Sequence, residues 1–160
     1  MIKKISFCLC FIICSCVSVP VVDKFNDGSI ELELTITNEK ESLSGKLICK
    51  NISATTMKIP SFYLSFSADE IQKHKFRSNW LDVRRADGSK IRYLGIYCEP
   101  SLDSLKKETT LLKKNSEFII YINDICRNYD FIPGEKVTIK YRGPLGISNT
   151  VECVVGNDIL

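Results

Sequence analysis

His74 is the only histidine in the chain, and it limits the chemistry that the sequence can support. A catalytic zinc usually takes three protein ligands that include histidines, and a Ser-His-Asp triad would have to use His74, which no nucleophile motif accompanies. Carboxylates occur at Asp69-Glu70, Asp82 and Asp87, but nothing in their spacing places two of them in one cleft. No glycine-rich phosphate loop is present. We therefore predict a protein without catalytic residues, cofactor or metal, which binds no catalytic zinc and hydrolyses no peptide.

Cysteines are the other residues with distinctive chemistry. Of the eight in the chain, four lie beyond the N-terminal segment: Cys49, Cys98, Cys126 and Cys153. Their gaps are much wider than a C-x-x-C metal motif, and an even number in an exported chain predicts two disulfides. The alternative, a Cys₄ zinc site, is disfavoured in an oxidising compartment. Alternation in Leu47-Ile48-Cys49 points Cys49 inward, and among the three connectivities we favour Cys98–Cys126 with Cys49–Cys153.

The first 19 residues have the three-part layout of an export signal. Two lysines precede an apolar run from Ile5 to Val17, and small residues follow. This run is shorter than the roughly 20 apolar residues that a membrane span requires. Pro20, with the serines before it, argues against the alternative of an uncleaved anchor that reaches Val22.

The end of this segment suggests how the protein is anchored. Ile13-Cys14-Ser15-Cys16 resembles the lipobox of bacterial lipoproteins, in which a small residue precedes the cysteine that carries the lipid. The resemblance implies lipidation of Cys16, whose acyl chains would hold the protein at a membrane. No aspartate follows Cys16, a pattern that resembles sorting to the outer membrane where the host has one. The expected location is thus a membrane-anchored lipoprotein, or the periplasm.

The charge balance excludes one class of partner. The chain has 22 basic and 19 acidic residues, a net charge of +3. Without the two leader lysines it has 20 basic residues against 19 acidic ones, or +1. Nucleic-acid binding requires Lys and Arg gathered on one surface, and the short basic runs here lie among acidic residues. We expect no nucleic-acid partner.

Short segments of alternating apolar and polar residues recur along the chain, and each predicts a β-strand. Asp87-Gly88 between two of them predicts a tight hairpin, and Pro60 predicts a bulge or an edge in the apolar segment 57–66. Short helices are expected only within 68–76 and 102–106. The predicted strands are Ile30–Thr37, Leu43–Lys50, Met57–Phe66, Trp80–Arg85, Lys90–Tyr97, Glu117–Asn123, Lys136–Arg142 and Ile147–Val155.

Together these segments predict an all-β protein, an immunoglobulin-like antiparallel β-sandwich of about 7–9 strands. Trp80, the single tryptophan, is expected to pack in its core. No repeat or long linker divides the chain. We predict a signal peptide at residues 1–15, a tether at residues 16–29 and the sandwich domain at residues 30–160.

Several motifs occur in an order that is similar to a known family. They are Leu47–Ser53 with Pro60–Phe62, Leu81–Gly88 with Ile91–Gly95, Thr110–Leu112 with Ser116-Glu117, and Tyr129–Phe131 with Pro133-Gly134 and Tyr141-Arg142. This order resembles the immunoglobulin-like domain that precedes the catalytic domain of some bacterial deuterolysin-type metallopeptidases. Lys114-Asn115 replaces the Pro-Gly of that pattern, and the four cysteines are not part of it. The resemblance implies the fold and no protease activity, because the metallopeptidase domain is absent. Small bacterial proteinase-inhibitor sandwiches are more distantly similar.

Three function classes follow from these observations. The first is a non-enzymatic binding or accessory module of the cell envelope, with an unknown protein or envelope ligand as its partner. An exposed aromatic patch formed by Phe62, Tyr63 and Phe66 would serve it. The second is an inhibitor of a protease or lysozyme, which would act through the Cys98–Lys114 loop. The third is an enzyme, which would need a cleft with converging polar groups.

Overall fold

Alternation of apolar and polar side chains produces the two longest strands, β1 (Ile30–Glu39) and β2 (Ser42–Asn51). The computed structural model describes residues 28–39, 42–64, 80–95 and 109–157. Within it, β1 and β2 form an antiparallel hairpin whose register runs from Ile30 opposite Asn51 to Glu39 opposite Ser42. This register places Leu34 opposite Leu47, and both side chains are buried. Period-two alternation therefore gives the hairpin one buried face.

The remaining strands complete three antiparallel sheets. The first has the order β1-β2-β6, the second β4-β7-β8, and β3 pairs with β5 in a short third sheet. Two 3₁₀ helices, η1 and η2, follow β3 and β6. The bounds are β3 (Met57–Pro60), η1 (Ser61–Leu64), β4 (Leu81–Arg85), β5 (Thr109–Leu112), β6 (Glu117–Ile122), η2 (Ile125–Asn128), β7 (Lys136–Gly143) and β8 (Gly146–Val154).

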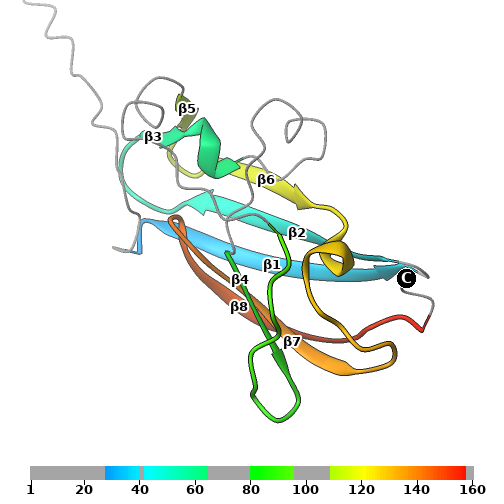
Figure 1. The fold of residues 1–160 in the computed structure, drawn as a ribbon. Helices are drawn as coiled ribbons and strands as arrows, with labels where there is room; N and C mark the ends of the chain where they lie inside the picture. Colours follow the sequence, from blue (N-terminus) through cyan, green and yellow to red (C-terminus); the bar gives the residue numbers. More distant parts are fainter. Residues whose placement is uncertain (1–27, 40–41, 65–79, 96–108, 158–160) are drawn as a thin grey trace, which may run out of the picture.

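The two three-stranded sheets form the layers of a β-sandwich (Figure 1). Their inward side chains make one core, in which Leu34, Leu47 and Ile120 come from the first layer and Val83, Ile139 and Tyr141 from the second. Burial of an aliphatic side chain of this kind contributes about 1.5–3 kcal/mol. In chain order the layers correspond to strands A, B, E and C, F, G of an immunoglobulin domain. The predicted all-β, immunoglobulin-like sandwich is thus confirmed.

A side-chain amide joins the two layers along one edge. The Asn149 carboxamide on β8 accepts a hydrogen bond from the Leu34 N–H at 2.7 Å and donates one to the Leu34 carbonyl at 3.0 Å. Further along, the Asn38 amide donates to the Val154 carbonyl at 2.7 Å. Residues 34 and 38 of β1 thus lie beside residues 149 and 154 of β8, so the two strands run parallel. These contacts satisfy backbone groups that an open edge would expose.

The tight turn predicted at Asp87-Gly88 is present, but the second arm of its hairpin is not a strand. The Gly88 N–H donates to the Arg85 carbonyl, and Gly88 has a φ of 83°, which favours glycine. After Ile91, whose N–H still donates to the Val83 carbonyl, the chain leaves β4, and Tyr93 pairs with Tyr129 in the β6–β7 connection. The prediction of a strand at Lys90–Tyr97 is therefore wrong for residues 90–95, and residues 96–97 lie outside the described residues. Packing of the Tyr93 and Tyr129 rings, with centroids 5.3 Å apart, accounts for the change of partner.

Three further elements differ from the sequence prediction. The segment predicted as a strand at Met57–Phe66 is a strand only as far as Pro60, after which η1 begins. Neither β5 nor η2 was predicted, because both are short and lack alternation. The helices expected within 68–76 and 102–106 lie outside the described residues.

Candidate functional site

Asn51-Ile52-Ser53 matches the Asn-x-Ser pattern of glycosylation sites, but its polar side chains have a structural role. Asn51 is fully buried, and its amide nitrogen donates to the Thr55 carbonyl at 2.8 Å and to the Leu112 carbonyl at 3.0 Å. Its amide oxygen accepts from the backbone N–H and the hydroxyl of Ser53, at 2.9 and 2.6 Å. Asn51 therefore joins the end of β2 to the loop before β3 and to β5. With both amide hydrogens engaged and the side chain buried, Asn51 in the folded state is closed to modification.

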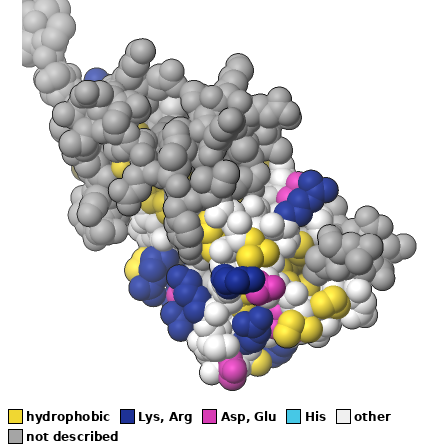
Figure 2. Space-filling model, viewed as in Figure 1, with side chains coloured by type: hydrophobic (Ala, Val, Ile, Leu, Met, Phe, Trp, Pro, Cys, Tyr) yellow, Lys and Arg dark blue, Asp and Glu magenta, His cyan; other side chains and the backbone are white. Residues whose placement is uncertain are grey.

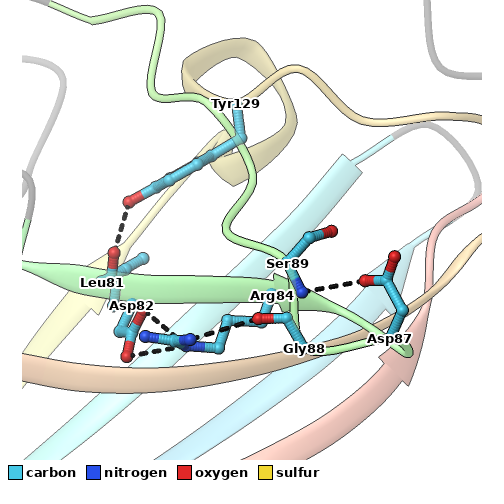
Figure 3. A network of polar contacts seen from close by, with 7 residues as sticks. All are labelled: Leu81, Asp82, Arg84, Asp87, Gly88, Ser89 and Tyr129. Carbon is cyan, nitrogen blue, oxygen red and sulfur yellow. Dashed lines mark hydrogen bonds and ion pairs between the residues drawn. The ribbon is translucent and has the colours of Figure 1, made fainter.

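The charged residues around the β4 turn are used in structural ion pairs (Figure 3). Arg84 contacts the Asp82 carboxylate at 3.1 Å, and its guanidinium also donates to the Gly88 carbonyl. The Ser89 N–H donates to the Asp87 carboxylate at 2.8 Å. Hydrogen bonds from Ser89 lower the pKa of Asp87, and nearby Arg85 adds to the effect. A carboxylate held in the ionised form is unsuited to act as a general acid.

The same region ties β4 to the β6–β7 connection. Arg85 contacts the Glu135 carboxylate at 3.1 Å, and Arg92 contacts the Asp130 carboxylate at 3.2 Å. The Tyr129 hydroxyl donates to the Leu81 carbonyl at 3.0 Å (Figure 3). These contacts hold β4 and the segment after it against the β6–β7 connection.

Two aromatic residues singled out from the sequence, Trp80 and Tyr63, pack in or against the core. Trp80 packs edge-on against Tyr63 and Tyr141, with ring centroids 6.0 and 6.4 Å away. The core role predicted for Trp80 is thus confirmed. Tyr63 is only 7% exposed, so the aromatic patch predicted from Phe62, Tyr63 and Phe66 is wrong in this residue. Tyr63 is buried because η1 follows Pro60 and turns the chain back onto the core; Phe66 lies outside the described residues.

Three of the four predicted disulfide cysteines are described, and all three are free thiols. Cys49 and Cys126 are buried and Cys153 is half-buried, while Cys98 lies outside the described residues. Burial raises the pKa of Cys49 to about 12. Its thiol therefore stays protonated at neutral pH, which makes it a poor nucleophile or metal ligand. The favoured Cys49–Cys153 pairing is absent.

Cys126 and Cys153 lie together. The Leu43 N–H donates to the Cys126 sulfur at 3.2 Å. Burial raises the pKa of Cys126, and this hydrogen bond opposes the rise. Burial also raises the pKa of Cys153, and the neighbouring Cys126 raises it further. This effect on the pKa of Cys153 is consistent with two thiols that lie near each other.

The outer face of the β1-β2-β6 sheet carries apolar side chains that the core does not use. Its register places Ile48 beside Ile119 and Lys46 beside Tyr121, and we call these four residues the Tyr121 face. Tyr121 is 59% exposed, and the other three residues are half-buried. An exposed aromatic ring next to aliphatic side chains is a feature of protein-binding surfaces.

Charges on the side of the molecule seen in Figure 2 are mixed in sign, with basic and acidic side chains interspersed. Lys136 and Glu152, for example, form an exposed ion pair at 2.8 Å. Within the described ranges, no three His, Cys, Asp or Glu side chains lie where they could hold a metal ion. No helix in the same ranges is long and apolar enough to cross a membrane.

Several predicted site residues lie outside the described residues: the lipidation candidate Cys16, His74 and the carboxylates Asp69-Glu70. Of the Cys98–Lys114 loop, the structure describes only residues 109–114, where β5 pairs with β3. This end of the loop is thus part of a sheet. The described residues that most resemble an interaction site are those of the Tyr121 face. In comparisons with known proteins, no family model and no curated protein matches the chain.

Proposed function

We propose that the protein is a non-catalytic binding module of the bacterial cell envelope, which binds a protein partner through the Tyr121 face. The observation that carries this proposal is the exposure of the Tyr121 ring beside Ile119 and Ile48 on a regular sheet. Tyrosine is enriched at protein interfaces, because its rigid ring buries a large area at low entropic cost. The side chains of Asp82, Asp87 and Asn51 contact other parts of the fold.

The proposed location rests on the N-terminal segment. Two lysines, a short apolar run and the lipobox-like Ile13-Cys14-Ser15-Cys16 support export followed by lipidation of Cys16. A lipid anchor at the N-terminus, separated from β1 by a short tether, would hold the sandwich at the membrane surface.

Lipidation of Cys16 is tested by metabolic labelling with a palmitate analogue. We expect the wild-type protein to be labelled and the Cys16→Ala variant to carry no label, because the acyl chains attach to that residue. Cys14→Ala serves as the control and should keep the label. Equal labelling of wild type and Cys16→Ala would contradict the proposal.

Binding through the Tyr121 face is tested by retention of envelope proteins on the immobilised protein. We expect Tyr121→Ala to reduce retention of the partner about 10- to 30-fold, as truncation of a central aromatic residue does at an interface. The matched control is Leu111→Ala on β5, since Leu111 is 58% exposed and lies outside this face. Equal retention by wild type and both variants would argue against the Tyr121 face.

A further inference from the structure

The strand registers restrict which cysteines can pair. Cys49 lies opposite Leu32, whereas Leu43, whose amide contacts the Cys126 sulfur, lies six positions away from Cys49 along β2. Six strand residues span about 20 Å. A disulfide requires Cα atoms within roughly 7 Å of each other. Cys49 therefore cannot reach Cys126 in this fold.

The same reasoning separates Cys49 from Cys153. Asn38 of β1 donates to the carbonyl of Val154, the residue after Cys153. Asn38 is six positions from Leu32, the β1 residue opposite Cys49, which is again about 20 Å. Four cysteines can pair in three ways, and two of these contain Cys49–Cys126 or Cys49–Cys153, the pairs that the registers exclude. The connectivity that is left joins Cys126 to Cys153.

Direct neighbours place Cys126 and Cys153 at one end of the sandwich. Leu43, whose amide contacts the Cys126 sulfur, pairs with Asn38 across the β1–β2 hairpin, and Asn38 contacts the residue after Cys153. Cys153 pairs with Val137, which is fully buried, so its side chain shares the inward face of β8. Both sulfurs thus belong to the same part of the core.

We propose that Cys126 and Cys153 form a disulfide that fastens the last strand, β8, to η2 in the β6–β7 connection. Formation of this disulfide in living cells depends on the export that we propose above, because structural disulfides persist in oxidising compartments.

The oxidant is a disulfide donor, either an envelope thiol–disulfide oxidoreductase or, in the test tube, glutathione disulfide. Cys153, the more accessible thiol, loses its proton and attacks one donor sulfur, which forms a mixed disulfide and releases a donor thiolate. Cys126 then loses its proton and attacks the Cys153 sulfur, which releases the second donor thiolate. The two cysteines lose two electrons and two protons, and the donor gains both electrons.

Peptide mapping without reduction tests the pairing. The full-length chain is purified from the cell envelope in detergent, and one part is digested and analysed by mass spectrometry directly. A second part is reduced and then equilibrated with reduced and oxidised glutathione. We expect a peptide that links Cys126 to Cys153 in both parts.

The directly digested sample and the glutathione-treated sample together show whether the pairing or the proposed location is wrong. A bridge that forms only in the glutathione arm would support the pairing and contradict export. Linkage of Cys126 or Cys153 to Cys98 in either arm would overturn the pairing, and so would free thiols at both positions after glutathione treatment.

Thermal unfolding gives a second, independent measurement. We expect Cys126→Ser, Cys153→Ser and the double variant each to lower the Tm of the oxidised protein by about 10 °C. The three decreases should be equal, because either substitution removes the whole bridge. Reduction of the wild type should lower the Tm by at least as much without any substitution, and this measurement does not depend on a variant that folds. Decreases that add in the double variant, or a wild-type Tm unchanged by reductant, would contradict the bridge.

Discussion

Replacing Asn51 with aspartate is expected to destabilise the protein by about 3–5 kcal/mol at neutral pH, as the loss of one partner in a buried polar network does. The amide nitrogen of Asn51 donates to two backbone carbonyls, those of Thr55 and Leu112. A carboxylate oxygen at the same place would face both carbonyl oxygens with no hydrogen to donate, and it would bury a charge. Chemical denaturation of wild type and variant at pH 7 measures the difference.

The pH dependence of the Asn51→Asp variant follows from the same contacts. Burial against two carbonyls raises the folded-state pKa of the new carboxyl above its unfolded value of about 3.9. The part of the penalty that comes from the charge is therefore fully present above the folded-state pKa and is lost as the pH falls below the unfolded value. The neutral carboxyl has one hydrogen for two carbonyls, so the rest of the penalty stays. We expect the stability gap to the wild type to narrow between pH 7 and pH 4. A constant gap over this range would contradict the assigned role of the amide hydrogens.

Asn115→Asp provides the matched control. Asn115 is exposed in the turn before β6 and has a φ of 58°, a conformation that asparagine and aspartate both tolerate. The same chemical change should therefore alter stability there by no more than about 0.5 kcal/mol. A comparable loss at Asn51 and Asn115 would mean that burial of Asn51 is not the cause.

Gly143→Ala is expected to destabilise the protein by about 2–4 kcal/mol through overpacking. A Cβ atom at Gly143 would lie 2.5 Å from Cζ of Tyr141 and 3.0 Å from Cγ of Trp80, closer than real Cβ contacts allow. Tyr141 is fully buried and its ring packs edge-on against Trp80, so the Tyr141 ring has little space into which it can move. Denaturant unfolding with near-ultraviolet circular dichroism would report both the loss of stability and the displaced rings.

Gly45→Ala is the control for this effect, since Gly45 lies within β2 as Gly143 lies within β7. A Cβ at Gly45 would meet aliphatic side-chain atoms of Ile36 and Ile122 at 3.2 and 3.4 Å, which the end of an isoleucine side chain can relieve. We expect a smaller change, within about 1 kcal/mol. Equal destabilisation at the two glycines would show that the Tyr141 and Trp80 rings are not the cause.

Much of the secondary structure was predictable from local pattern. The segments Ile30–Thr37 and Leu43–Lys50 alternate in period two, and both form strands close to the predicted bounds. Asp87-Gly88 predicted a tight turn, because glycine adopts positive φ without a steric penalty. Asn115 also has a positive φ of 58°, a left-handed conformation that asparagine tolerates. Signals of this kind involve residues within a few positions of one another.

The candidate site was less predictable because its chemistry depends on residues far apart in the chain. The motif Asn51-Ile52-Ser53 was visible, but its partner Leu112 lies 61 positions away. Tyr63 looked available for binding, yet the turn after Pro60 buries it beside Trp80. Tyr121 was part of a predicted strand, but only the pairing of β6 with β2 places it beside Lys46 and Ile119 on an outer face.

The sequence by itself determined the strand-rich architecture and the turns, because period-two alternation and positive-φ residues are local features. Only the tertiary structure decided which strands share a sheet and at what register. That arrangement separates Cys49 from Cys153 by about six strand positions and brings Cys153 next to Cys126. The physical reason is that a residue's face follows from its own strand, whereas its neighbours across the core follow from the packing of all the strands together.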